Sequence, residues 1–541
     1  MKDISSTGSF VDFTLENFIY VDKTAYIPQL VKLKRVFISR PRRFGKSLTL
    51  DTIATLFETG VEPYFKGTWI YDKWTEPTYP VLRLNFLNFD KNSLEKFNNK
   101  LNSKITEFAE LNQVTTYKEK EEAEDSIDHL LEQLRLEGRQ IVVLIDEYDC
   151  QMTANINNET LYKQFQEKIK SFYANIKDKF AIKFLGITGV TRLKDISIFS
   201  VGSDINDITN ASAYSQMIGF TRDEIKKYYI DYLKLASSYG NNCSVDDVTD
   251  TQLESMLDMM AQNYDGYCFD EDYEKKVFST WSVNKFFQTM IEKKKVQFGE
   301  YWYDNGGLPS ILVNYLKTHE LNIFEYLDKD KFLKVSSDDF KNPTALTTIN
   351  QNVLMCQTGY LTLRSDLNKT STVALGIPNG EIYKALNRLL ANNIFKGNTD
   401  ITDDYGRSLL EVGTVDDIIN LFNSALNSVS YDNYPIVSES SVQNMLKLYL
   451  LGAHQEVLSE VHEAKGRADL VVNTDNRRIV FEFKYAKNEA EAKSKLSEAV
   501  EQIKTRDYGN ILPKKNELIR IAAVFNADPK VRAFTENQIV P

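Results

Sequence analysis

A glycine, a lysine and a serine follow one another in the basic stretch of residues 40–47, RPRRFGKS, and this combination is suited to binding a triphosphate. Backbone amides at the start of a helix attract phosphate, and a lysine there adds a positive charge. We expect Lys46 to reach the β- and γ-phosphates and the Ser47 hydroxyl to bind Mg²⁺. The stretch departs from G-x-x-x-x-G-K-[ST], because Arg40 stands at the position of the first glycine. A basic surface turn is the alternative interpretation.

The surroundings of this stretch have the order that a phosphate-binding loop needs. The apolar run of residues 36–38 precedes it and a helical pattern follows it, so strand, loop and helix come in succession. We expect most of the loop to contact the nucleotide through backbone amides and positive charge. The predicted contacts are Arg40, Pro41, Arg42, Arg43, Phe44, Gly45, Lys46, Ser47 and Leu48.

Two adjacent acids end the apolar part of residues 140–150, QIVVLIDEYDC. Five consecutive apolar residues are typical of a strand buried on both faces of a parallel sheet. We expect Asp146 to hold Mg²⁺ and Glu147 to orient or deprotonate the attacking water. A loop with exposed charge is the alternative, but two acids about 100 residues after a Gly-Lys-Ser turn favour an ATP site.

Two further segments are candidates for the same site. Residues 181–188, AIKFLGIT, predict a neighbouring strand, after which Thr188 and Arg192 are candidates for sensing the γ-phosphate. The alternative is an ordinary turn from strand to loop. Near the start of the chain, residues 22–24 (Asp-Lys-Thr) predict a cap before a short helix. In many P-loop ATPases such a segment lies beside the nucleotide base.

A second group of chemically suited residues lies near the C-terminus. The strand patterns of residues 468–472 (ADLVV) and 479–485 (IVFEFKY) flank a polar turn. Folding them as a hairpin puts Asp469 opposite Glu482, and the period of two places Lys484 on the same face as Glu482. Two carboxylates on adjacent strands suit Mg²⁺ or Mn²⁺, which can activate water and stabilise charge on a phosphoryl group.

The same hairpin pairing puts Val472 opposite Ile479 and turns the aromatic neighbours of Glu482 toward a core. Lys484 would position the water or offset negative charge. Glu460, on a preceding strand, and Gln502, on a following helix, are weaker candidates for the same site. A surface hairpin with a cross-strand salt bridge is the alternative interpretation.

Composition limits the class of protein. The chain has 541 residues, 42% of them hydrophobic, and a net charge of −11, so we expect several packed domains and no general affinity for polyanions. The four cysteines form no CxxC pair, which disfavours a disulfide framework or a zinc site. The first residues contain no apolar core of a signal peptide, and no run approaches the roughly 18 apolar residues of a membrane span. We expect a reduced cytoplasmic protein without a membrane partner.

Helical patterns separate the two candidate sites. Leucine, isoleucine and phenylalanine at helical spacing predict an amphipathic insertion in residues 91–138. Residues 216–300 predict a helical lid, whose first helix begins with Thr221 and Glu224 as a capping box. Residues 302–319 predict another helix, and residues 300–380 suggest a small winged-helix-like module.

At this point the motifs resemble known families. Six segments of this chain resemble the bacterial AAA-ATPase-like family: YVDKT, RPRRFGKSL, LIDEYD, GITGVTR, GFT and QTGYLTL. In that family the basic form of the phosphate-binding loop, R-P-R-R-F-G-K-S, is the usual one. The C-terminal GRADLVV, VFEFKY and EAVEQIKTRDY resemble the PD-(D/E)XK nuclease superfamily. That likeness implies roles for Asp469, Glu482, Lys484, Gln502 and Tyr508. The first acid follows alanine instead of proline, and Glu439 is the candidate for an acid on the preceding helix.

The resemblance implies an α/β fold with a P-loop core and parallel sheet, a lid, a winged-helix-like middle and a C-terminal restriction-endonuclease-like domain. The expected divisions are residues 1–215 for the ATPase core, 216–300 for the lid, 301–380 for the middle module, 381–435 for a helical connector and 436–541 for the nuclease-like domain.

The function that follows is an ATP-driven switch coupled to a metal-dependent nuclease acting on DNA, in defence or mobile-element biology. The alternative is a nucleotide-dependent protein-interaction switch with a catalytically silent nuclease fold. A second copy of the chain or another protein is a further expected partner class.

Overall fold

The chain folds into two compact units, residues 1–319 with 332–382 and residues 320–331 with 383–541. The computed structural model describes residues 1–177, 179–193, 205–302, 310–316, 319, 323–343, 345–367, 369, 371–395, 406–453, 455–463, 466–510 and 514–541. The helix expected over residues 302–319 falls partly outside these residues. No helix within the described ranges is both long enough and apolar enough to cross a membrane.

The centre of the first unit is a five-stranded parallel sheet with the order β2-β3-β4-β1-β5. The strands are β1 (Arg35–Ser39), β2 (Val81–Asn85), β3 (Ile141–Asp146), β4 (Ile182–Gly189) and β5 (Asn206–Asp207). Every residue of β3 is buried, as its unbroken apolar run predicts. The expected α/β core with a parallel sheet is confirmed.

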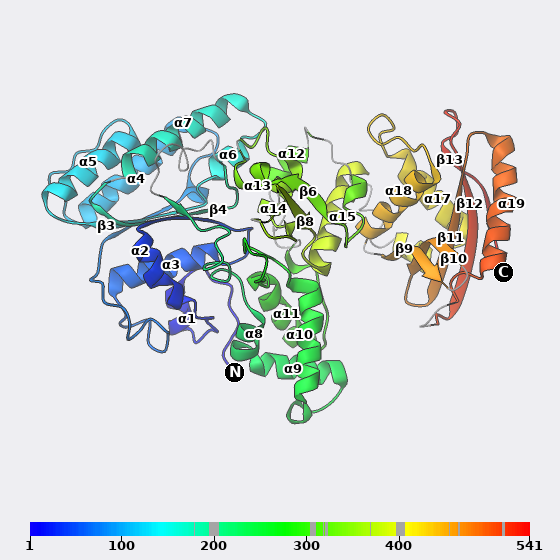
Figure 1. Ribbon diagram of the computed structural model, residues 1–541, viewed down its shortest axis with the longest axis horizontal. Coiled ribbons are helices and arrows are strands. Elements are labelled where there is room, and N and C mark those ends of the chain that lie inside the picture. Colours follow the sequence, from blue (N-terminus) through cyan, green and yellow to red (C-terminus); the bar gives the residue numbers. More distant parts are fainter. Residues whose placement is uncertain are drawn as a thin grey trace. The chain divides into compact units, whose positions relative to one another are not determined.

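Helices cover both faces of this sheet (Figure 1). On one side lie α1 (Phe10–Leu15), α2 (Ile27–Leu33) and α3 (Lys46–Thr59). On the other lie α4 (Leu94–Leu111), α5 (Ala123–Leu136) and α7 (Glu159–Ile176), which pack against one another, and the short α6 (Cys150–Ala154) follows β3. The predicted amphipathic insertion is therefore the pair α4 and α5, whose apolar residues are buried.

Four helices follow the core: α8 (Arg222–Tyr228), α9 (Ile230–Asn241), α10 (Asp250–Tyr264) and α11 (Thr280–Lys293). The capping box predicted for Thr221 and Glu224 is present at the start of α8. Apolar side chains of α8–α11 share one buried cluster with Ile19 and Val21 of the N-terminal segment. The N-terminal segment is therefore packed into the lid.

The remainder of the first unit contains a three-stranded sheet with the order β6-β8-β7. Its elements are α12 (Ser310–Leu316), β6 (Leu333–Ser336), α13 (Ser337–Lys341), α14 (Gln351–Gln357), β7 (Thr362–Leu363) and β8 (Thr372–Gly376). Short one-turn 3₁₀ segments occur in the first unit at Thr24–Tyr26, Phe86–Asn88 and Val245–Asp247, and in the second unit at Ile323–Glu325.

The second unit is built on a five-stranded mixed sheet with the order β13-β12-β11-β10-β9. The strands are β9 (Glu456–Glu463), β10 (Gly466–Asn473), β11 (Arg477–Ala486), β12 (Glu517–Asn526) and β13 (Ala533–Ile539). The helices are α15 (Gly380–Ile394), which begins in the first unit, α16 (Arg407–Val412), α17 (Val415–Asn427), α18 (Glu439–Gly452) and α19 (Glu489–Arg506). This unit includes helices that we expected in a separate connector.

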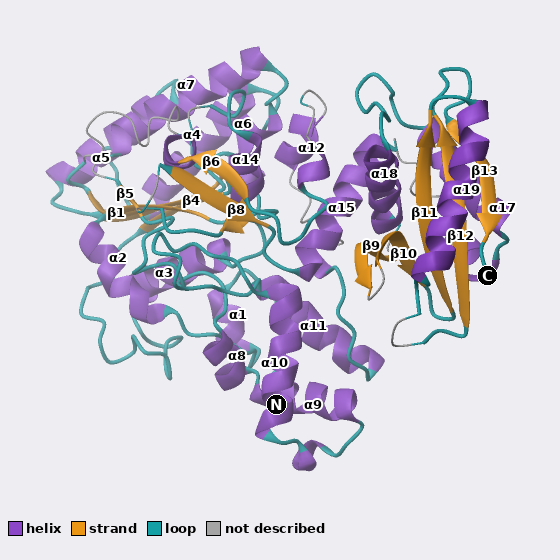
Figure 2. Cartoon of the chain, turned by 45° about the vertical axis from the view of Figure 1, so that its right-hand side comes forward, coloured by secondary structure: helices purple, strands orange, loops and turns teal. Residues whose placement is uncertain are grey.

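Alternation along β11 shows which helix covers which face of this sheet. Val480 packs in a cluster with Ile503 of α19, whereas the ring of Phe481 contacts Phe422 of α17. Consecutive side chains of a strand point to opposite faces, so α19 and α17 lie on opposite sides of the sheet (Figure 1), and α19 is the helix in front of β11 and β12 in Figure 2. Glu482 and Lys484 share the parity of Val480 and therefore belong to the face of α19.

Two candidate active sites

The phosphate-binding loop has the expected strand, loop and helix geometry. β1 ends at Ser39 and α3 begins at Lys46, with Gly45 as the residue before the helix. Gly45 has a φ of 102°, a left-handed conformation that glycine adopts without a side-chain clash. Arg43 also has a positive φ of 70°, which is uncommon for a residue with a side chain and often marks a functional loop.

Three polar side chains from distant parts of the chain meet at the start of α3. The Ser47 hydroxyl donates to Asp146 Oδ2 at 2.6 Å, and the Thr188 hydroxyl donates to Asp146 Oδ1 at 2.5 Å. The backbone N–H of Glu147 also donates to Asp146 Oδ1, at 3.0 Å. The parallel sheet causes this convergence, because the carboxyl ends of β3 and β4 lie at the same edge as the end of β1.

Lys46 and Glu147 form the charged part of the same site. The Lys46 ammonium donates to the carbonyls of Arg40 and Pro41 at 3.1 and 3.2 Å and lies 3.6 Å from Glu147 Oε1. Burial raises the pKa of the Glu147 carboxyl, and the positive charge of Lys46 opposes this effect. A carboxyl whose pKa is raised toward neutrality is better matched to accepting a proton from water than an ordinary glutamate is.

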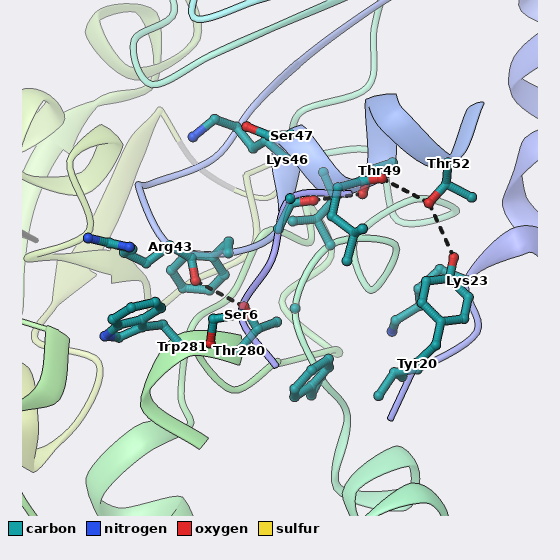
Figure 3. Close-up of a pocket in the computed structure, with 18 of the residues that line it drawn as sticks. Ser6, Tyr20, Lys23, Arg43, Lys46, Ser47, Thr49, Thr52, Thr280 and Trp281 are labelled. Atoms are coloured by element: carbon teal, nitrogen blue, oxygen red, sulfur yellow. Dashed lines mark hydrogen bonds between the residues drawn. The ribbon is translucent and has the colours of Figure 1, made fainter. Parts of the chain in front are cut away.

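A cavity of about 510 Å³ adjoins these residues (Figure 3). It extends along α3 from Lys46 to Thr52 and is bounded by the N-terminal segment and by the lid. Residues of the phosphate-binding loop that line it are Arg42, Arg43, Phe44, Gly45, Lys46, Ser47 and Leu48, together with Glu147. Lys23 and Thr24 line it too, so the segment expected beside the base opens onto the same cavity as the lysine and serine of the loop.

Two of the residues predicted to contact the nucleotide, Arg40 and Arg192, do not line this cavity. Arg40 is buried, donates to the carbonyls of Ser39 and Thr209 at 2.9 and 2.6 Å, and lies 4.1 Å above the ring of Phe269. Arg192 pairs with Asp207 and also donates to a backbone carbonyl. Neither side chain lines the large cavity, because the contacts just described hold each of them at a second, smaller cavity.

Pro41 also faces away from the large cavity. It lines a small separate cavity with Arg40 and Arg192, and a Cβ at Gly359 would lie only 2.8 Å from the Pro41 side chain. Gly359 has a φ of 93°, so glycine is required there for backbone conformation as well as for space. This turn belongs to the QTGYLTL motif.

Residues of the lid also contact the phosphate-binding loop, and the sequence analysis did not identify them. The Arg43 guanidinium stacks on Trp281 at 4.0 Å, and the Thr280 hydroxyl donates to the Arg43 carbonyl at 2.9 Å. The ring of Phe44 lies edge-on to Tyr267, 4.7 Å between centroids. The consecutive Arg42, Arg43 and Phe44 of the loop were the available signal, since basic and aromatic side chains need partners when they leave water.

Asp149 is a second residue that the sequence analysis missed. It is buried and accepts from the backbone N–H and the hydroxyl of Thr191, at 2.7 and 2.6 Å. It thereby joins the ends of β3 and β4. A Cβ at Gly189 would collide with Tyr148 and with this carboxylate, so the two strand ends approach each other too closely for any side chain there.

The C-terminal hairpin has the predicted register. Val472 pairs with Ile479 and Leu470 pairs with Phe481, which places Asp469 at the position opposite Glu482. Lys484 Nζ donates to Glu482 Oε1 at 2.9 Å, so these two side chains share a face as expected. The backbone N–H of Phe483 donates to Asp469 Oδ2 at 2.8 Å. The three side chains are therefore collected at adjoining positions of β10 and β11.

The electrostatics of this hairpin fit a cation. Glu482 is fully buried, and burial together with the nearby charge of Asp469 raises its pKa to about 7. Its Oε2 atom has no hydrogen-bond partner among the described residues, although a buried carboxylate oxygen normally has one. An unsatisfied hard oxygen beside a second carboxylate is a donor set that Mg²⁺ or Mn²⁺ prefers.

Among the described residues, two carboxylates, those of Asp469 and Glu482, contribute directly to this hairpin site. The described residues contain no cluster of three or more His, Cys, Asp or Glu able to hold a metal. Mg²⁺ commonly uses one or two protein carboxylates and retains water on its other positions, so two are sufficient for it.

The remaining candidates of the second site are less directly involved. Glu439, at the start of α18, lies 3.3 Å from Lys484 Nζ, which places the acid of the preceding helix at the site. Gln502 lies 3.4 Å from the hydroxyl of Tyr508, and no described contact joins it to Asp469 or Glu482. The side chain of Glu460 lies outside the described part of the structure.

Comparisons with known proteins match an N-terminal and a C-terminal region of the chain. Residues 5–199 match a family described as predicted AAA-ATPase, and residues 437–535 match the PD-(D/E)XK nuclease superfamily. Both resemblances indicated by the motifs are therefore confirmed. The chain is also 26% identical over 534 residues to an uncharacterized protein in vnfD 5'region of Azotobacter chroococcum mcd 1, covering 95% of this chain and 94% of that protein.

Two solved structures show a weak likeness over most of the chain. Cdc6p from Pyrobaculum aerophilum has 11% identity and a TM-score of 0.23, covering 69% of this chain and 96% of its own. The ORC2 protein of Aeropyrum pernix, in ADPNP–ADP complexes, has 10% identity and a TM-score of 0.24, covering 67% and 91%. At TM-scores this low, neither structure bears on the positions of the site residues in this chain.

The raised pKa of Glu482 makes a testable prediction for stability. The folded protein holds this proton up to about pH 7, whereas an unfolded glutamate releases it near pH 4.5. Because the folded state binds more protons in this interval, its stability falls as the pH rises from 5 to 8. In wild type we expect the free energy of unfolding to fall by about 2 to 3 kcal/mol at most over this pH interval. In Glu482→Gln this decrease should be absent.

Thermal unfolding of the full chain between pH 5 and pH 8 measures this effect. The control is Glu501→Gln, an exposed position on α19 for which the wild-type pH dependence should persist. Excess Mg²⁺ at pH 8 should stabilise wild type more than it stabilises Glu482→Gln. An identical pH dependence in wild type and Glu482→Gln would contradict the assignment of the buried proton to Glu482.

Proposed function

We propose that this chain, which joins an AAA-ATPase-like domain to a domain of the PD-(D/E)XK nuclease superfamily, binds and hydrolyses ATP to control a metal-dependent nuclease acting on DNA. The observation that carries the proposal is the contact of Ser47 with Asp146 beside a cavity that also contains Lys46 and Glu147. We further propose that the protein acts in the cytoplasm, either as a homo-oligomer or with a protein partner.

The ATP half of the proposal assigns a task to each residue around the cavity. Lys46 would exchange the carbonyls of Arg40 and Pro41 for phosphate oxygens, which carry more negative charge. Glu147 would accept a proton from the attacking water, helped by its raised pKa. Thr188 holds one oxygen of Asp146, and so fixes that carboxylate relative to Ser47.

Mg²⁺ fits beside Ser47, since a hydroxyl and a carboxylate are oxygen donors of the kind it binds. When bound, the ion supplies positive charge that stabilises the phosphoryl oxygens during transfer. Ser47 and Asp146 would hold it. The hydrogen bond between them keeps both groups in place at the start of α3, on rigid elements instead of a free loop.

The nuclease half rests on the hairpin. Asp469 and Glu482 would hold a divalent cation, whose contribution when bound is to activate water and to offset charge on the phosphodiester. Lys484 would orient the water or neutralise developing negative charge, and Glu439 keeps its ammonium at the site. The unsatisfied Glu482 Oε2 supports this assignment, because burying such an atom without a partner is costly.

A nucleotide-dependent protein-interaction switch with a silent nuclease fold is the second candidate. The net charge of −11 favours it, because an acidic protein repels a polyanion unless a local basic surface compensates. Lys484 is also already paired with two acids in the structure. DNA affinity that changes little with salt would support this candidate, since few phosphates would be neutralised.

The ATP site predicts two variants with different consequences. Lys46→Ala should weaken ATP binding at least about 100-fold, because the phosphates lose their principal cation. Glu147→Gln should bind ATP within about threefold of wild type yet hydrolyse it about 10² to 10⁴ times more slowly, because amide nitrogen and oxygen accept no proton. Equilibrium binding and steady-state phosphate release measure the two quantities separately.

Lys100→Ala is the matched control, since Lys100 is an exposed lysine of α4 remote from the cavity lining. It should leave binding and turnover unchanged. Hydrolysis at the wild-type rate by Glu147→Gln would show that another group is the base.

The nuclease site makes its own prediction. Purified wild type should cleave DNA in Mg²⁺ or Mn²⁺, with a rate that depends on ATP, and Lys484→Ala or Asp469→Asn should lower that rate at least about 100-fold. Linear, nicked, supercoiled and single-stranded DNA should each be assayed, with Lys504→Ala on α19 as the exposed control. If wild type and Lys484→Ala behave alike on every substrate, the fold is silent and the interaction switch is favoured.

A further inference from the structure

The cavity extends well beyond the residues that would hold phosphate. It follows α3 from Lys46 to Thr52, a distance of about 9 Å at 1.5 Å per residue. At the far end Tyr20 reaches Thr52, and away from the loop the lining also includes the apolar and aromatic residues Tyr26, Ile27, Met217, Ile218 and Phe220. A lining of this kind suits the flat faces of a nucleobase better than it suits charged phosphates.

Lys23 is the charged side chain at that far end. Figure 3 shows Lys23 and Tyr20 beside Thr52, with Lys46 and Ser47 near the beginning of the same helix. The Tyr20 and Thr52 hydroxyls are 3.5 Å apart, so this part of the N-terminal segment contacts the later turn of α3 and not its start. Lys23 is therefore displaced from the phosphate end of the cavity.

The Lys23 ammonium is held from behind by two acceptors. Its Nζ lies 2.6 Å from Glu224 Oε2 and 2.7 Å from the carbonyl of Gln216, and its side chain is only 14% exposed. Lys23 lines the cavity, whereas Glu224 and Gln216 do not. An ammonium has three N–H donors, so one remains that the described contacts do not use.

Both neighbours of Lys23 in the chain are fixed, which limits how far the ammonium can move. Asp22 accepts from the backbone N–H and the hydroxyl of Thr24 at 2.9 and 2.7 Å, and from the backbone N–H of Trp69 at 2.6 Å. Glu224 is itself fixed, because its carboxylate accepts from the N–H of Thr221 in the capping box of α8. The lysine is thus pre-positioned at the cavity wall.

We propose that Lys23 recognises the base of the nucleotide, donating a hydrogen bond to a ring nitrogen of a purine, and that Glu224 is the positioning residue that holds it. This inference rests on the proposed ATP site. It assigns the two lysines of the cavity to opposite ends of one ligand, Lys46 to the triphosphate and Lys23 to the base. It also connects base binding to the first helix of the lid, because Glu224 belongs to α8.

The test compares ligands that differ in having a base. We would measure equilibrium binding of Mg²⁺–ATP and of Mg²⁺–tripolyphosphate to full-length wild type, Lys23→Met and Lys46→Met. Lys23→Met should bind ATP about 10 to 100 times more weakly, the usual effect of losing a hydrogen bond from a charged donor, and should bind tripolyphosphate within about threefold of wild type. Lys46→Met should lose affinity for both ligands.

A control for folding is needed, because Lys23→Met leaves the half-buried Glu224 carboxylate without its cation. The double variant Lys23→Met/Glu224→Gln removes that unpaired charge and should show the same selective loss for ATP, with thermal unfolding close to wild type. Glu224→Gln alone should weaken ATP binding less than Lys23→Met, since the ammonium remains but is held less firmly.

Analogues of ATP that each lack one ring nitrogen then identify the atom that accepts the hydrogen bond from Lys23. Among 1-deaza-, 3-deaza- and 7-deaza-ATP, the one that lacks the acceptor nitrogen should bind wild type weakly and lose nothing further with Lys23→Met. If 2′-deoxy-ATP alone behaves in that way, Lys23 contacts the ribose and the assignment to the base is overturned.

Other outcomes also separate the inference from the proposed function. An equal loss of ATP and tripolyphosphate affinity in Lys23→Met would make Lys23 a phosphate ligand and overturn the inference. Unchanged ATP affinity in that variant would overturn it as well, and both results would leave the ATP site standing. Failure of wild type to bind either ligand would overturn the ATP site and the inference with it.

Discussion

The hydrogen bond between Ser47 and Asp146 is the contact on which the rest of the first unit depends. It spans 99 residues and joins the first turn of α3 to the last residue of β3. The parallel sheet, in which β4 separates β1 from β3, brings these groups together, because each strand delivers its carboxyl end to the same edge. Thr188, at that edge of β4, completes the contact from the strand between them.

The two candidate sites share one electrostatic arrangement. In each, burial raises the pKa of a glutamate, and a lysine lies within 4 Å of it: Glu147, directly after β3, with Lys46, and Glu482, within β11, with Lys484. Such pairs contribute little net stability after the cost of removing both charges from water. Their presence beside a cavity or an unsatisfied oxygen is better explained by phosphate chemistry than by stability.

The sequence predicted the elements whose signal is local. The five apolar residues before Asp146 gave β3, and the period of two gave the pairing of Val472 with Ile479 and the shared face of Glu482 and Lys484. Arg40 shows where such reasoning ends. Its position in the loop predicted a phosphate contact, yet its partners are Thr209 and Phe269, about 170 and 230 residues later in the chain. Contacts between residues so far apart cannot be predicted from a local sequence pattern. The stacking of Arg43 on Trp281 was hidden for the same reason.

The most direct measurement is a crystal structure of the protein with Mg²⁺ and a non-hydrolysable ATP analogue. We expect the triphosphate in the cavity along α3, the ion in contact with Ser47 Oγ, and the Lys46 ammonium moved from the carbonyls of Arg40 and Pro41 to phosphate oxygens. A structure in which Lys46 keeps those carbonyls while the analogue binds outside this cavity would contradict the assignment of this loop to ATP.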